Sequence, residues 1–200
     1  ARRLAENGCR VLVPTVIDRQ LEKRGGRAEM TNREYLYRSA FELGRHLIGY
    51  EIQKVLAGLD WFERDNPHAD VSVGVIGYGD GGMIALYAAA LDRRIDVACV
   101  NGYFGSRQRI WEQPLDRNVF GLLEQFGDAE LASMVLPRRL IIESSRAPQI
   151  EFPSSGGAPA ILRQPTTTEV QQEIQRLQQL AVPWKESIHW IAASSEADLT

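Results

Sequence analysis

The sequence predicts an α/β fold in which a mostly parallel sheet carries helices on both faces. Three runs support this interpretation: strand-like VSVGVI at 71–76, helix-like GMIALYAAALD at 82–92 and strand-like IDVACVNGYF at 95–104. Short links join them in the order strand, helix, strand. Two strands joined through a helix lie parallel in one sheet, with the helix packed on a face of that sheet.

Composition limits the classes of function. The 200 residues carry a net charge of -3 and are 44% hydrophobic and 24% charged, which suits one soluble globular domain. The two signs of charge are mixed along the chain, so we expect no nucleic-acid partner. No apolar run approaches the roughly 18 residues of a membrane helix, so we expect no membrane partner. The oligomeric state stays open.

Cysteine and histidine content predicts neither a disulfide framework nor a metal site. Cys9 and Cys99 have neither C-x-x-C nor metal-ligand spacing. His46, His68 and His189 are far apart, and none has a second ligand-type residue at metal spacing. We therefore expect no metal and no cofactor.

The first third of the chain predicts a strand, a loop and a long helical region. Residues 9–18 form a short β-branched apolar run, typical of a buried parallel strand, and polar residues 19–32 indicate an exposed loop. Helical apolar spacing follows over 34–64, with a slip near Gly44 and Gly49 that predicts one kinked helix or two helices in series. Thr31 or Asn32 is expected to cap this region at its start.

The later elements are less regular. Short apolar helices are expected around 119–126 and 129–135, and RRLIIESS at 138–145 predicts a further strand. Tryptophan-rich WKESIHWIAASS at 184–195 suggests a short helix, and no additional strand is evident before Thr200.

Composition divides the chain into three parts. Residues 1–148 carry the α/β pattern, 149–165 are rich in Pro, Gly and Ser and predict a loop or linker, and 166–200 predict a helical insert or extension. Thr166 and Glu169 form a capping box for a Gln-rich helix. Its apolar stripe, formed by Val170, Ile174 and Leu177, is thin, so we expect this helix to pack on the surface.

The turn GYGDGG at 77–82 fits two templates. Gly77, Gly79 and Gly82 spell G-x-G-x-x-G, the dinucleotide-binding pattern. That pattern needs an acidic residue roughly 20 residues on to bind the ribose, and the following strand instead ends in Asn101 and Gly102. Dinucleotide binding through these three glycines is therefore the weaker alternative.

The second template is the hydrolase nucleophile elbow, small-x-nucleophile-x-small. Gly77 and Gly81 occupy the small positions, with Gly82 next, and the nucleophile position is Gly79. Glycine has no side chain that could attack a carbonyl carbon. A shift by one residue would make Asp80 the nucleophile, but it would put Tyr78 where a small residue is required.

Residues 73–104, VGVIGYGDGGMIALYAAALDRRIDVACVNGYF, resemble the middle of an α/β-hydrolase of the dienelactone hydrolase and acetylxylan esterase kind. The resemblance extends over residues 1–148 and implies a partial α/β-hydrolase core. It implies serine or cysteine at position 79, where this chain has glycine, and an acid at position 147, where it has Ala147. The family's histidine would follow an eighth strand, and one oxyanion donor would be the backbone N–H of Asp80.

The resemblance therefore implies a degenerate esterase-like protein without Ser-His-Asp hydrolysis in this chain, whose pocket binds a carbohydrate or acyl ligand. The alternative is an active hydrolase using Asp80 or residues outside this segment. Glu143, at a strand end, could replace the missing acid, and His189 could supply a base. Asp80 could equally be an ordinary acidic residue at a helix N-terminus.

Aromatic residues complete the expected site. The resemblance implies that Tyr103, Phe104 and Trp111, which follow a strand, line a substrate pocket together with Tyr78 of the elbow. A satellite aromatic cluster is the alternative for the first three. The chain lacks an initial Met, so we expect a piece of a longer protein, with any leader upstream of Ala1. Its compartment stays open, a secreted or periplasmic location being compatible with the likeness to carbohydrate esterases.

Overall fold

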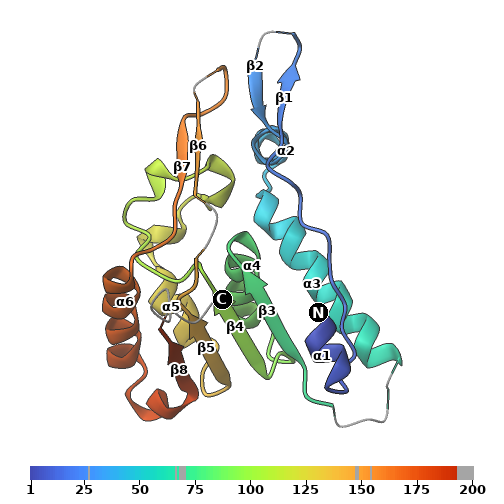
Figure 1. Ribbon diagram of the computed structural model, residues 1–200, viewed down its shortest axis with the longest axis vertical. Coiled ribbons are helices and arrows are strands. Elements are labelled where there is room, and N and C mark those ends of the chain that lie inside the picture. Colours follow the sequence, from blue (N-terminus) through green and yellow to red (C-terminus); the bar gives the residue numbers. More distant parts are fainter. Residues whose placement is uncertain (27, 66, 68–70, 147–148, 154, 193–200) are drawn as a thin grey trace, which may run out of the picture.

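A parallel four-stranded sheet forms the centre of the molecule (Figure 1). The computed structural model describes all residues except 27, 66, 68–70, 147–148, 154 and 193–200. The strands are β3 (Gly74–Tyr78), β4 (Val97–Asn101), β5 (Arg139–Glu143) and β8 (Ile188–Ile191), in that spatial order and all parallel. Helices flank the sheet, so the expected α/β class is confirmed.

The β3–α4–β4 unit is the one expected from the sequence. Helix α4 (Asp80–Leu91) follows β3 directly, and eight of its residues are buried, because the helix is apolar all round and packs between the sheet and other helices. The main core joins α4 to the inward residues of β4 and β5, which are Ala98, Val100, Leu140 and Ile142. Within the part of the chain that the structure describes, no helix is long and apolar enough to cross a membrane.

The run at 9–18 is not a strand, contrary to expectation. After α1 (Arg2–Glu6) the chain is extended but has no ladder partner among the described residues. Helix α3 (Leu47–Asp65) instead satisfies parts of its backbone: Lys54 donates to the carbonyl of Thr15 at 3.2 Å, and the N–H of Ile17 donates to Glu51 at 3.3 Å. Side chains of α3 thus provide hydrogen bonds that this backbone would otherwise make to a neighbouring strand.

Residues 19–32 are also different from the expected loop. They hold an antiparallel hairpin of β1 (Leu21–Arg24) and β2 (Ala28–Thr31). Gly25 and Gly26 have φ values of +60° and +74°, which glycine adopts readily, so the pair permits the tight turn that a polar composition alone does not reveal.

Two helices in series follow, one of the two expected arrangements. Thr31 caps α2 (Asn32–Glu42), since its side chain accepts the N–H of Glu34 at 3.1 Å. Gly44, with φ of +71°, interrupts the helical backbone between α2 and α3. Gly49, the other expected break, lies inside α3.

The segment after β4 is mostly irregular. Three single 3₁₀ turns, η1 (Ile110–Glu112), η2 (Leu115–Arg117) and η3 (Leu122–Glu124), precede the short helix α5 (Asp128–Ser133). The helix expected over 119–126 is reduced to η3, since Gly121 is left-handed at its start, with φ of 75°.

The Pro/Gly-rich segment contains a second hairpin, where a loop was expected. Strands β6 (Ile150–Phe152) and β7 (Ala160–Leu162) pair antiparallel. Both hairpins project beyond the carboxyl end of the central sheet (Figure 1). Phe152, Ala160 and Leu162 of the β6–β7 hairpin form a small apolar cluster, separate from the main core.

The C-terminal elements belong to the core, which corrects two expectations. Helix α6 (Thr167–Leu180) has the predicted capping box, but its apolar stripe is buried in the main core against α5 rather than on the surface. The stretch expected to be a short helix divides into the 3₁₀ segment η4 (Val182–Ser187) and strand β8. β8 is the additional strand that the sequence did not reveal. It has only four residues, and they alternate between partly buried (Ile188, Trp190) and exposed (His189, Ile191).

Candidate functional site

The turn between β3 and α4 has the backbone of a nucleophile elbow. Gly79 lies at its apex with φ of 56° and ψ of -116°, a conformation that residues with a side chain rarely adopt. A Cβ on Gly77 would lie 1.8 Å from the carbonyl oxygen of Gly81, and one on Gly82 would lie 2.9 Å from that of Asn101. Gly81 has open space, so the need for small residues falls on positions 77 and 82.

A pocket of about 250 Å³ opens at this elbow. It is bordered by the elbow itself, by the end of β4, by η2 and by the end of β7. The lining residues are Val16, Tyr78, Gly79, Asp80, Gly81, Gly102, Arg117, Leu162 and Arg163. Ligands of open parallel sheets bind beyond the carboxyl ends of the strands, which is where this pocket lies.

Asp80 is held by two arginines. Its Oδ2 accepts from Arg19 Nε at 2.8 Å, and its Oδ1 accepts from Arg117 Nε at 2.7 Å. Burial favours the neutral acid, but the charges of Arg117 and Arg19 outweigh it and hold the pKa of Asp80 well below its usual value. Asp80 is therefore ionised, and each of its oxygens already accepts a hydrogen bond from an arginine.

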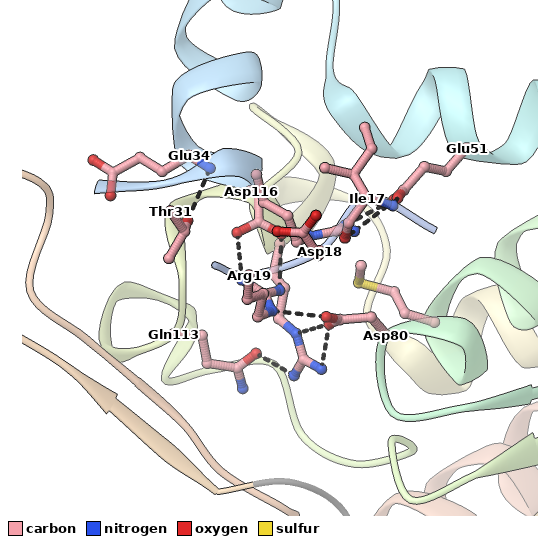
Figure 2. Close-up of polar contacts among 12 residues, drawn as sticks. Ile17, Asp18, Arg19, Thr31, Glu34, Glu51, Asp80, Gln113 and Asp116 are labelled. Carbon is pink, nitrogen blue, oxygen red and sulfur yellow. Dashed lines mark hydrogen bonds and ion pairs between the residues drawn. The ribbon is translucent and has the colours of Figure 1, made fainter. Parts of the chain in front are cut away.

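A buried ion network extends from Asp80 towards the helices (Figure 2). Asp116 accepts two bonds from Arg19, at 2.8 and 2.9 Å, and one from Arg33 Nε at 2.7 Å. Arg33 in turn donates two bonds of 2.7 Å to Glu51. The side chains of Arg33 and Asp116 have no exposed surface, so these charges depend on each other for compensation.

This network was not foreseen from the sequence. Its partners lie far apart in the chain: 97 residues separate Arg19 from Asp116, and 83 separate Arg33 from Asp116. The sequence shows only scattered arginines and acids without a motif, and no local pattern pairs them. The network joins the N-terminal segment, α2, α3, the elbow and η2 at one side of the pocket.

Glu143 lies at the carboxyl end of β5, as expected, but not beside the elbow. Tyr78, Asn101 and Glu143 pair in one row across β3, β4 and β5, so two strand spacings, about 10 Å, separate Glu143 from the end of β3. Asn101 Nδ2 donates to Glu143 Oε2 at 2.7 Å, and Ser145 donates to Asn101 Oδ1.

His189 lies on β8 with an exposed side chain, beside Ile141 in the ladder. Three strand spacings, roughly 14 Å, separate β8 from β3, so His189 does not meet Asp80. His68 and Ala147, at the position of the family's acid, lie outside the described residues. Among the residues that are described, no group of three or more His, Cys, Asp and Glu side chains could hold a metal ion.

Of the four expected aromatic residues, only Tyr78 lines the elbow pocket. Tyr103 and Phe104 are buried in the core, where Tyr103 donates to the fully buried carboxyl group of Asp128 at 3.1 Å. Trp111 is 72% exposed on η1. The pocket is instead completed by residues the sequence did not single out, namely Arg117, Leu162, Arg163 and Val16.

A parallel sheet whose strand β3 passes through a glycine-closed elbow into a buried helix is the central arrangement of the α/β-hydrolase fold. The chain belongs to the dienelactone hydrolase family, whose model matches residues 1–122. This membership explains the elbow geometry around Gly79 and favours the hydrolase template over the dinucleotide template.

Known proteins similar to this chain agree with that assignment. A presumed hydrolase, YtaP of Bacillus subtilis (strain 168), is 30% identical over an alignment of 122 residues, which covers 58% of this chain and 39% of YtaP. The crystal structure of a presumed acetyl xylan esterase from Bacteroides fragilis NCTC 9343 has a TM-score of 0.61 and 13% identity, covering 84% of this chain and 42% of that chain.

A promiscuous CE15 esterase from a marine bacterial metagenome has a TM-score of 0.47 and 15% identity, covering 75% of this chain and 44% of that one. This chain thus spans less than half the length of these relatives. At 13% identity, the likeness to the Bacteroides fragilis structure shows the fold.

Proposed function

We propose that this protein binds a small ligand bearing a carboxylate in the elbow pocket and does not hydrolyse esters through a Ser-His-Asp triad. One observation carries the proposal: the elbow keeps its backbone geometry, yet Gly79 stands at its apex. A nucleophile is thus absent at the one position that the turn exposes to a ligand.

Asp80 is a poor substitute for the missing nucleophile. An attacking carboxylate needs electron density that it can give to the substrate, whereas two arginine guanidinium groups pair with Asp80 and hold its pKa well below the usual value, which makes it a weak nucleophile. Glu143 and His189, the other expected catalytic groups, lie two and three strands away from the elbow strand. The expected acid, base and nucleophile therefore do not converge.

The pocket offers more donors than acceptors. Arg117 and Arg163 line it, and the first N–H groups of α4, at Asp80 and Gly81, point from a helix N-terminus without intrahelical acceptors. The one carboxylate among the lining residues, that of Asp80, already has two arginine partners. Such a lining matches the oxygens of a carboxylate or an ester, which only accept hydrogen bonds.

Arg163 is the most adaptable of these donors. Its side chain is 26% exposed and pairs with Glu169 at 2.9 and 3.0 Å, so a ligand can reach it from solvent. Leu162 and Val16 add apolar surface beside it. The combination suits either an acidic sugar or a short acyl compound.

Matched ligand pairs test this proposal by calorimetry on the full-length protein. The probes are D-glucuronate against D-glucose, and butyrate against butyramide, because each pair differs mainly in the carboxylate. We expect one carboxylate to bind and its neutral partner not to bind, and Arg163→Gln to weaken binding about fivefold or more, the usual loss for one charge-assisted contact. The control is Arg109→Gln, which removes a 59% exposed arginine paired with Glu112.

Equal affinity for charged and neutral partners, or no binding of either carboxylate, would refute the proposed ligand class. Stabilisation by NAD would instead favour the dinucleotide alternative, which is weakened by the amide of Asn101 at the end of β4. Turnover of p-nitrophenyl acetate that is lost in Asp80→Asn would favour Asp80 as a nucleophile.

A further inference from the structure

The β6–β7 hairpin lies at the border of the elbow pocket. We call the described residues 150–153 and 155–162 the strap. At its base, Leu162 lines the pocket together with the next residue, Arg163. Arg19, which binds Asp80, stacks its guanidinium over the ring of Phe152 on β6, with 6.0 Å to the ring centroid. The base of the strap thus lies beside the pocket and its Arg19 wall.

The tip of the strap is bonded to the β1–β2 hairpin and to α2. The N–H of Glu29 donates to the carbonyl of Ser155 at 2.8 Å, and the N–H of Ala158 donates to Glu34 Oε1 at 2.8 Å. Glu29 and Gly156 also form an isolated parallel bridge. Glu34 is buried, so its carboxylate makes the strong, charge-assisted contact of this latch.

The described strap residues share only a small apolar cluster, and β7 also packs on η1. This cluster holds only Phe152, Ala160 and Leu162 and is separate from the main core. A two-stranded hairpin is marginally stable without further packing, and segments with few buried apolar contacts open locally at low free-energy cost. The strap can therefore separate from the β1–β2 hairpin while the central sheet stays folded.

We infer that the strap is a gate for the elbow pocket, latched by the hydrogen bond between Ala158 and Glu34, and that a ligand enters when this latch opens. This inference rests on the proposed function, because it concerns access to the same pocket. Three observations support it. The base of the strap lines the pocket, its tip is hydrogen-bonded to α2, and its small apolar cluster is separate from the main core.

Access to the elbow is measured without any ligand. In a full-length Cys9→Ser background, Gly79→Cys places a thiol at the apex, and its modification by iodoacetamide is followed by peptide mass spectrometry, with Cys99 tracked separately. We expect Glu34→Ala to raise the rate at position 79 about fivefold or more, since it removes a hydrogen bond to a charged acceptor. Arg38→Ala is the matched control.

Arg38 pairs with the same Glu34 oxygen at 2.6 Å, and its side chain is 48% exposed. Its removal should change the rate less than about twofold, as expected for an exposed pair. An unchanged rate in Glu34→Ala would overturn the gate, and equal increases in both variants would overturn the latch. Because no ligand is present, the result is independent of whether carboxylates bind.

Hydrogen exchange gives a second test that does not require a residue change at Gly79. Amides of β6 and β7 should exchange faster than those of β4 and β5, and Glu34→Ala should accelerate the strap alone. Strap amides as protected as β4, or an acceleration spread over the whole sheet, would contradict a locally opening strap.

Discussion

Asp116→Asn should destabilise the protein far more than the same change at the surface. Asp116 has no exposed side-chain area and accepts three hydrogen bonds of 2.7–2.9 Å from Arg19 and Arg33. In this variant Arg19, Arg33 and Arg117 face only two carboxylates, those of Asp80 and Glu51. Removing one partner of a buried ion pair costs about 3–5 kcal/mol, because the remaining charge loses its compensation without regaining water.

The matched control is Asp60→Asn. Asp60 is 64% exposed and pairs with Arg94 at 2.7 Å, so the change in chemistry is the same while the burial differs. An exposed pair contributes about 0–1 kcal/mol. Urea unfolding, followed by far-UV circular dichroism, gives the free energy of unfolding of each variant of the full-length protein.

The result that would refute this reasoning is a similar loss for both variants. A loss below about 1 kcal/mol for Asp116→Asn would mean that water or rearranged side chains compensate Arg19 and Arg33. The network would then not be what holds these elements together beside the pocket.

Three further predictions concern the elbow, the core and α6. Gly77→Ala should lower the free energy of unfolding in urea by about 3 kcal/mol or more, since its Cβ would lie 1.8 Å from a backbone oxygen. Gly81→Ala, in open space, should be neutral or raise that free energy by up to about 1 kcal/mol. Burial raises the pKa of Asp128 from 3.8 to about 6, so the folded state keeps a proton that the unfolded chain loses. The free energy of unfolding should therefore fall as pH rises from about 4 to about 6. Asp128→Asn should remove that part of the pH dependence. An unchanged slope in the variant would contradict the assignment to Asp128. Thr166→Ala should lower the free energy of unfolding by about 1 kcal/mol, because it removes the capping box of α6. Thr168→Ala, beyond the cap, should lower it less. Equal losses in the two variants would contradict the role of the cap.

The elements that the sequence predicted well are those with a strong local signal. The β3–α4–β4 unit was predictable because apolar runs of the right lengths flank the glycine turn, and the start of α6 because Thr166 and Glu169 form a capping box. The break at Gly44 was also visible, since it interrupts a helical apolar spacing.

The elements that were missed depend on contacts distant in sequence. Residues 9–18 have the composition of a strand, but the side chains of Lys54 and Glu51 on α3 bond to their backbone. Both hairpins lie in polar or Pro/Gly-rich stretches whose pairing depends on turn glycines and on each other. β8 has four residues and becomes a strand only beside β5.

The candidate site was predicted in its backbone but not in its side chains. The glycines of the elbow follow a local spacing that sterics impose, so Gly77, Gly79 and Gly82 could be placed from the sequence. Arg117 and Arg163 reach the pocket from an irregular segment and from the end of a hairpin, and no sequence pattern brings them together.

The most direct measurement is hydrolysis of p-nitrophenyl acetate and acetylated xylan by the full-length protein beside its Asp80→Asn variant. With glycine at the elbow apex and the Asp80 oxygens held by arginines, the account predicts that both proteins stay at the buffer rate. Turnover by the native protein that disappears in Asp80→Asn would contradict it and would make Asp80 the nucleophile of an active hydrolase.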